Sequence, residues 1–138
     1  MTNRIISIAG LVVLIGLLCG FLPKTPAQNS QAKKGMIKVT ILYPNGEGKK
    51  FDMDYYTHTH MPMVASLLGD SLKLFEIDKG IAGRTATDPI PYLAIGYLYF
   101  DRLSAYQNSF KPHAEKIRSD IPNYTDIQPV IQISEVVR

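Results

Sequence analysis

Along residues 36–138, hydrophobic positions recur either every second residue, as in a strand, or every three to four residues, as in a helix. The points where one pattern gives way to the other predict six elements of secondary structure. Strict alternation from 36 to 43 predicts a half-buried strand, because successive side chains of a strand point to opposite faces. Apolar residues at helical spacing predict a helix that Asp52 or Asp54 can cap and that stops at Gly69. The expected order is a strand at 36–43, a helix at 52–68, strands at 72–79 and 92–100, a helix at 104–120 and a strand at 127–137.

This β-α-β-β-α-β order predicts an α+β fold, the ferredoxin-like sandwich. With right-handed crossovers, the strands form an antiparallel sheet and both helices pack on one of its faces. The strand at 92–100 is apolar on both faces, although helices can cover only one of them. Because an uncovered apolar face usually marks an association surface, we expect a homodimer packed sheet to sheet.

The first predicted helix carries two of the three histidines of the chain. His58 lies on the far side of the helix from Tyr56 and should contact solvent, whereas His60 follows Tyr56 by one turn. Pro62 should kink the helix, because it removes a backbone hydrogen bond. The buried face should consist of Tyr56, His60, Met63, Val64, Leu67 and Leu68.

Two further local features concern a strand and a helix start. Gly96 stands in the middle of the strand at 92–100, where a missing side chain either weakens the strand or leaves room for a ligand. Ser104 and Gln107 have the spacing of a reciprocal capping box, with Ser104 as the N-cap of the second helix.

The amino terminus has the pattern of an export signal. Arg4 precedes an apolar run at 5–22, and small residues near Ala27 suit a signal peptidase. We therefore expect a signal peptide at 1–27, a linker at 28–35 and a folded domain at 36–138. The location predicted is secreted or periplasmic, or membrane-anchored if the leader is not cleaved, since the run is just long enough to span a bilayer.

Charge and cysteine content exclude several classes of function. The formal net charge is +3, but residues 36–138 carry 11 basic and 12 acidic side chains, so the excess belongs to the leader and linker. This balance gives no electrostatic reason to expect nucleic acid binding. Cys19, the single cysteine, lies in the leader, which excludes a disulfide framework, a thiolate zinc site and a cysteine nucleophile in a cleaved chain.

Several short motifs resemble those of the EthD family, which is named for a protein of ethyl tert-butyl ether degradation. The residues that carry the resemblance are Met36-Ile37-Lys38-Val39, Phe51-Asp52-x-x-Tyr55-Tyr56-x-x-x-His60-x-Pro62, Phe110-x-Pro112-His113-Ala114, Asp120-Ile121-Pro122-Asn123-Tyr124-Thr125 and Gln132-Ile133-Ser134-Glu135. The resemblance covers nearly all of residues 36–138. The leader lies outside it.

The resemblance implies a dimeric α+β barrel, in which two ferredoxin-like protomers join their sheets. It also implies a pocket between sheet and helices for a small apolar or aromatic molecule. An EthD-type oxidoreductase (reductase) or a cofactor-free monooxygenase-like enzyme is the activity expected, although a shared fold does not choose a reaction.

His60 is the candidate catalytic residue, as a general acid or base, because imidazole titrates near neutrality. Tyr55 and Tyr56 are candidates for orienting the substrate, and His113, Asn123 and Tyr124 for lining the mouth of the pocket. Each also has a structural interpretation: a core residue with a satisfied hydroxyl, a helix cap for His113, or a turn residue for Asn123.

Two alternatives remain open at this stage. The protein could be a non-catalytic binding or accessory protein, with His60 as a structural polar contact. It could also be a haem protein with His60 or His113 as axial ligand, although no feature requires haem. We expect no cofactor and no metal, because His58 and His60 point to different sides of a helix and no carboxylate cluster completes a site.

Overall fold

The computed structural model describes residues 31–138, and the sequence predictions about the leader and Cys19 lie outside this range. Four strands form one antiparallel sheet in the order β2-β3-β1-β4. The predicted ferredoxin-like α+β fold of the protomer is thus confirmed. The strands are β1 (Ile37–Pro44), β2 (Leu74–Lys79), β3 (Tyr92–Phe100) and β4 (Val130–Glu135).

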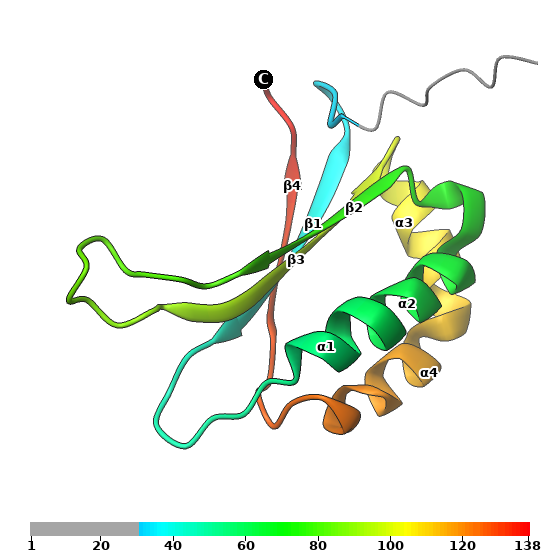
Figure 1. The fold of residues 1–138 in the computed structure, drawn as a ribbon. Helices are drawn as coiled ribbons and strands as arrows, with labels where there is room; N and C mark the ends of the chain where they lie inside the picture. Colours follow the sequence, from blue (N-terminus) through cyan, green and yellow to red (C-terminus); the bar gives the residue numbers. More distant parts are fainter. Residues whose placement is uncertain (1–30) are drawn as a thin grey trace, which may run out of the picture.

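All helical segments lie on one face of the sheet (Figure 1). They form two helical segments side by side in one layer, the first after β1 and the second after β3. The first segment comprises α1 (Met53–Tyr55), a π-helical turn η1 (Tyr56–His60), α2 (Met61–Leu68) and a 3-10 turn η2 (Gly69–Ser71). The second comprises α3 (Leu103–Phe110), η3 (Lys111–His113), α4 (Ala114–Ser119) and η4 (Ile121–Asn123). No helix within 31–138 is both long and apolar enough to cross a membrane.

The first helix begins and ends as predicted, but its interior is rotated by one residue. The Asp52 carboxylate accepts the amide hydrogen of Tyr55, and Gly69 ends α2 with a positive φ of 52°. Ahead of Pro62, the amide of Met61 bonds to the carbonyl of Tyr56, five residues back. This π-helical turn adds a residue to the helix before the proline.

The extra residue changes which side chains reach the core. Tyr56 and His60 are buried as predicted, but the buried row continues through Met61, Val64 and Leu68. Met63 and Leu67, predicted on the buried face with Val64 and Leu68, are only half-buried and pack at the edge of the core. His58 is exposed, as predicted.

Three boundaries differ from the predictions. The N-cap position of α3 is Arg102 and not Ser104, and its carbonyl accepts the amide of Ala105 at 3.0 Å. The strand predicted from 72 starts at Leu74, because the Leu72 amide still bonds to Gly69 within the preceding turn. The last strand is shorter than 127–137: it begins only after Pro129, which has no amide hydrogen for the ladder, and ends at Glu135.

The core lies between the sheet and the helices, and Gly96 has a clear role in it. Gly96 sits in β3 against the hydroxyl end of the Tyr56 side chain, and a Cβ at this position would overlap the Tyr56 hydroxyl. The space left by the missing side chain is therefore filled by Tyr56 itself and not by a ligand. The largest fully buried side chains are Tyr43, Tyr56, Phe100, Met61 and Val39.

The opposite face of the sheet has no helix over it (Figure 1). In the register of β1 and β3, Leu42 pairs with Ile95 and Thr40 with Tyr97, one position away from the pairs that face the core. Polar groups interrupt this apolar face, since the Tyr99 hydroxyl donates to Glu76 at 2.7 Å. The most exposed large apolar side chain on this face of the strands is Val130 of the edge strand β4, which is 54% exposed.

Candidate functional site

His60 and Asp120 form the central contact of the site. His60 is the last residue of η1, and Asp120 follows the last turn of α4, so each helical segment supplies one partner. The imidazole Nδ1 lies 2.8 Å from the carboxylate Oδ2 of Asp120. Both side chains are largely shielded from solvent, at 5% exposed for His60 and 16% for Asp120. The pair therefore stands where hydrogen bonds are stronger than on the surface.

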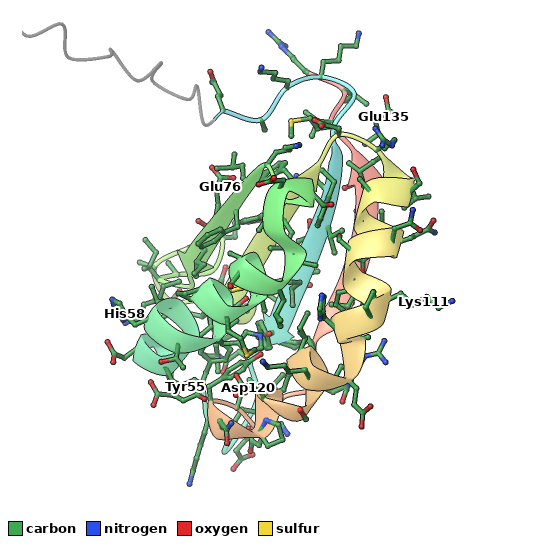
Figure 2. The ribbon with its side chains drawn as sticks, turned by 90° about the vertical axis from the view of Figure 1, so that its right-hand side faces the viewer. Tyr55, His58, Glu76, Lys111, Asp120 and Glu135 are labelled. Carbon is green, nitrogen blue, oxygen red and sulfur yellow. The ribbon has the colours of Figure 1, made fainter. Side chains whose placement is uncertain are left out.

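Asp120 accepts hydrogen bonds from three side chains. Besides His60, the Tyr55 hydroxyl donates to its Oδ1 at 3.0 Å and the Asn123 amide donates at 2.8 Å. Tyr55 and Asp120 lie beside each other at one end of the helical layer, and His58 points away from them (Figure 2). Burial would raise the pKa of Asp120, but these hydrogen bonds outweigh it and hold the pKa below 3.8. The carboxylate is therefore ionised and fixed in place.

The contact with Asp120 determines the state of the imidazole. An ionised carboxylate can only accept, so Nδ1 of His60 carries the proton and Nε2 is unprotonated in the neutral ring. Burial lowers the pKa of His60 below 6.5, against the opposing effect of the Asp120 bond and charge. His60 is thus a neutral base at neutral pH with one defined tautomer.

A set of tyrosines surrounds the imidazole. The Tyr124 hydroxyl lies 3.4 Å from Nε2 of His60, and 2.7 Å from the hydroxyl of Tyr43. The Tyr56 ring stacks on the imidazole, with 5.6 Å between ring centroids, yet its buried hydroxyl has no hydrogen-bond partner among the described residues. The weak contact at 3.4 Å leaves Nε2 free to engage another group.

A cavity of about 350 Å³ lies between the sheet and the helices, and His60 forms part of its wall. Its volume falls within the range of small-molecule pockets. Most of the lining is apolar or aromatic, with polar groups at a few points. The lining residues are Val39, Ile41, Tyr43, His60, Met61, Val64, Leu98, Tyr106, Phe110, Ile117, Arg118, Ile121, Gln128, Pro129 and Ile131.

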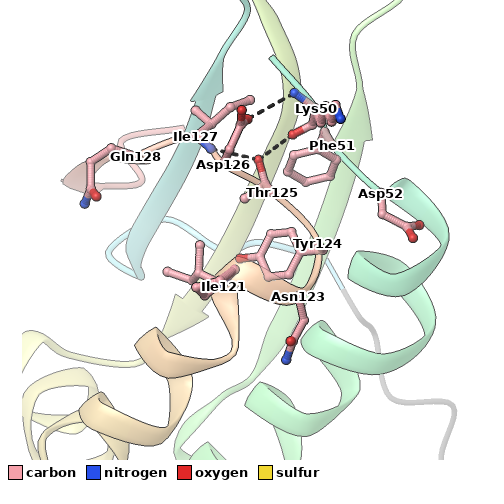
Figure 3. A pocket seen from close by; sticks show the side chains of 11 residues that line it. Lys50, Phe51, Asp52, Ile121, Asn123, Tyr124, Thr125, Asp126, Ile127 and Gln128 are labelled. Carbon is pink, nitrogen blue, oxygen red and sulfur yellow. Dashed lines mark hydrogen bonds between the residues drawn. The ribbon is translucent and has the colours of Figure 1, made fainter. Parts of the chain in front are cut away.

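A second hollow, of about 740 Å³, is a more open depression on the surface (Figure 3). It lies where the segment before α1 pairs with the segment after η4, through bonds of Lys50 with Asp126 and with Thr125. Asn123 and Tyr124 line this hollow and not the enclosed cavity. Because His60 belongs to the enclosed cavity alone, we place the candidate site there.

Comparison with known proteins supports one assignment. A family model described as the EthD domain matches residues 45–128, more than half of the chain. The chain belongs to the EthD family. No curated protein matches the sequence significantly.

Solved structures agree with the EthD assignment. An EthD-like protein from Ralstonia eutropha is 42% identical, with a TM-score of 0.73 over 77% of this chain and 96% of that one. An ethyl tert-butyl ether degradation family protein from Bacillus halodurans is 18% identical, with a TM-score of 0.58 over 74% and 99%. A DABB family protein with a ferredoxin-like fold from Mesorhizobium loti, at 14% identity and a TM-score of 0.50 over 76% and 100%, shares the fold.

Within this EthD domain, five of the six candidate residues gather around Asp120. Tyr55, His60 and Asn123 contact its carboxylate, and Tyr56 and Tyr124 pack on the imidazole. His113 stands apart: it is half-buried at the N-cap position of α4, with no hydrogen bond to this group among the described residues. It does not line the enclosed cavity either.

Asp120 is the residue of the candidate site that reasoning about single side chains missed. It lies 60 positions after His60, at the end of another helix. The only signal available was its place at the start of the Asp-Ile-Pro-Asn-Tyr motif. Among residues 31–138, no group of three or more His, Cys, Asp or Glu side chains is placed to hold a metal ion.

Proposed function

We propose that this EthD-family protein binds a small apolar or aromatic molecule in the enclosed cavity and transfers a proton to or from it through His60. The observation that supports the proposal is the His60–Asp120 contact at the wall of that cavity. Nδ1 is committed to Asp120, so Nε2 is the nitrogen that acts on the ligand. A buried imidazole with a fixed tautomer is well suited to general base catalysis.

Asp120 supports the reaction in both states of the imidazole. It holds Nδ1 protonated while His60 is neutral, and its negative charge stabilises the imidazolium that forms when Nε2 takes a proton. Tyr55 and Asn123 hold the carboxylate in position, since both donate to Oδ1. The role of Tyr55 is thus to position Asp120, whereas the sequence suggested direct contact with the substrate.

The proposed proton transfer is compatible with the oxidoreductase chemistry implied by the family resemblance. Removal of a proton from carbon or oxygen leaves the substrate as an anion. An electron-rich anion is the form that reacts with O₂ without a cofactor. A monooxygenase-type reaction would therefore begin with the same step at His60, and the chemistry of the substrate would determine the later steps.

The direct test is deuterium exchange into a ligand with an acidic C–H group. 1-Phenylpropan-2-one is a suitable probe, because an apolar ring adjoins the acidic carbon. In D₂O, the wild-type protein should accelerate exchange at this carbon, and His60→Gln should abolish the acceleration while still binding the ketone. His58→Gln is the matched control, since His58 also contacts an aspartate, Asp54 at 3.0 Å, but on the surface.

Two outcomes of this test would count against the proposal. If the wild type binds the ketone without accelerating exchange, the non-catalytic binding function is the better assignment. If His60→Gln exchanges as fast as the wild type, another group is the base. Thermal unfolding of each variant shows whether a loss of exchange reflects only a loss of fold.

We also propose the two assembly features expected from the sequence. The uncovered sheet face, which carries Leu42, Ile95 and Tyr97, would pack against a second copy to form the dimeric barrel. Residues 1–27 would direct the chain to the envelope or outside the cell, with cleavage after Ala27. The intact mass of the purified protein distinguishes a cleaved leader from a retained anchor.

A further inference from the structure

The wall of the enclosed cavity carries one positively charged side chain, in addition to the neutral imidazole of His60. Arg118, on α4, is exposed at the surface and also lines the cavity. Its guanidinium carbon lies 5.8 Å from the centroid of the Phe110 ring, so the group rests on an aromatic side chain of α3. Among residues 31–138, Arg118 takes part in no salt bridge.

Two neutral donors accompany Arg118 on the cavity wall. Tyr106 lines the same cavity, and its ring packs on Phe110, the residue under Arg118, with 5.4 Å between ring centroids. Gln128, which follows η4, also lines the cavity and supplies an amide group to its wall. A guanidinium, a phenol and an amide together can surround one planar anionic group.

From this arrangement, and resting on the function proposed above, we infer that the ligand is a monocarboxylate with an apolar body, whose carboxylate binds Arg118. A single cation balances one negative charge, which favours a carboxylate over a phosphate dianion. The apolar wall formed by residues such as Val64, Leu98 and Ile117 receives the body of the ligand.

Charge also determines which end of the ligand approaches His60. Asp120 is ionised and bonded to the imidazole, so a carboxylate beside His60 would be repelled. Arg118 lies two residues before Asp120, a rotation of about 200° around the helix, so the two side chains leave α4 on different sides. The Arg118 guanidinium lies over the Phe110 ring of α3. The carboxylate therefore binds at Arg118, and an uncharged carbon or hydroxyl is presented to Nε2 of His60.

The test compares carboxylates with amides of nearly the same shape. Phenylacetate, 3-phenylpropanoate and 4-phenylbutanoate are each titrated against the purified protein by calorimetry, beside phenylacetamide, 3-phenylpropanamide and 4-phenylbutanamide. At least one carboxylate should bind roughly tenfold more tightly than its amide, which is the effect of one charge-assisted hydrogen-bonded contact. Added salt should reduce this preference, because part of it is electrostatic.

Variants assign the preference to a residue. Arg118→Gln should bind the carboxylate and the amide equally, and Arg118→Lys should recover part of the preference because it keeps the charge without the planar fork. Arg102→Gln is the matched control, since Arg102 is exposed at the start of α3 and does not line the cavity. It should bind as the wild type does.

The outcomes separate this inference from the proposed function. If carboxylates and amides bind the wild type equally, or if Arg118→Gln keeps the preference, the role of Arg118 is wrong while the cavity remains a ligand site. If neither member of any pair binds, the cavity is not a site for such molecules, and the proposed function is wrong as well.

Discussion

The Nδ1 atom of His60 lies 2.8 Å from the Oδ2 atom of Asp120, although the two residues come from separate helical segments. This contact combines three properties of a general base: a fixed tautomer, a neutral ring and a carboxylate that stabilises the protonated form. Each property can be measured, through the rate of proton transfer, the dependence of stability on pH and the NMR signals of the imidazole.

Replacing Asp120 by Asn should impair proton transfer more than it impairs binding. The amide can offer hydrogen to Nδ1 and favour the wrong tautomer, and it no longer stabilises imidazolium. Deuterium exchange into 1-phenylpropan-2-one should slow by roughly 10²-fold or more, while the dissociation constant changes little. Asp54→Asn removes the carboxylate of the surface pair with His58 and should exchange at the wild-type rate. An unchanged rate in Asp120→Asn would show that His60 needs no partner.

The pH dependence of stability should carry the signature of His60. Its folded pKa is lowered below 6.5 by burial, so the unfolded chain takes up a proton before the folded protein does. The stability that the folded protein gains from a neutral His60 is fully present above pH 6.5. It is lost as the pH falls through that value toward the lower pKa of the folded state. In denaturant unfolding, the free energy of unfolding should therefore decrease between pH 7 and pH 5, and the decrease should be smaller in His60→Gln than in the wild type.

A matched variant separates this effect from general acid destabilisation. His58→Gln is the matched control, because it removes an exposed imidazole and leaves the buried one in place. Equal slopes in the wild type and His60→Gln would contradict the lowered pKa. An NMR titration of the imidazole ¹⁵N signals should also show Nδ1 protonated and Nε2 unprotonated at pH 7.

Gly96 and Tyr56 should behave as a coupled pair. Gly96→Ala should destabilise the protein by about 1–3 kcal/mol, because the new Cβ overlaps the Tyr56 hydroxyl in a packed core. Tyr56→Phe should change stability by less than about 1 kcal/mol, since the hydroxyl that it removes has no hydrogen-bond partner among the described residues.

The double variant Tyr56→Phe/Gly96→Ala tests the coupling directly. Without the hydroxyl, the nearest Tyr56 atom is Cζ at 3.6 Å from the new Cβ, an ordinary contact. The double variant should thus regain most of the stability lost by Gly96→Ala. Additive losses in chemical denaturation would mean that Gly96 is needed for its backbone and not for space.

The proposed homodimer should depend on the uncovered sheet face. Ile95→Glu places a charge opposite Leu42 on that face and should shift the protein from dimer to monomer in analytical ultracentrifugation. Ile81→Glu is the matched control, because Ile81 is 87% exposed in the loop between β2 and β3. A dimer that survives Ile95→Glu uses another surface, and a monomeric wild type rules out the dimeric barrel.

The sequence alone was sufficient for the order of the elements and for the buried direction of His60. Period-two alternation and helical spacing are local properties, so β1, β3 and the end of α2 could be located without knowledge of the fold. The resemblance to the EthD family also rested on local motifs, and the match over 45–128 confirmed it.

Tertiary structure decided what the local pattern could not encode. The π-helical turn before Pro62 shifts every later side chain by one residue, so Met61 joins Val64 and Leu68 in the core while Met63 and Leu67 are only half-buried. Packing also determined that Gly96 makes room for Tyr56.

The partner of His60 was decided by tertiary structure too. Only the packing of α4 beside the first helix brings Asp120 to His60, since the two are separated by 60 positions and by two strands of the sheet. Hydrogen bonds between distant segments depend on the complete fold, so they cannot be predicted from hydrophobic periodicity along the chain. The sequence therefore determined that a histidine faces the interior, and the fold determined which carboxylate fixes its tautomer.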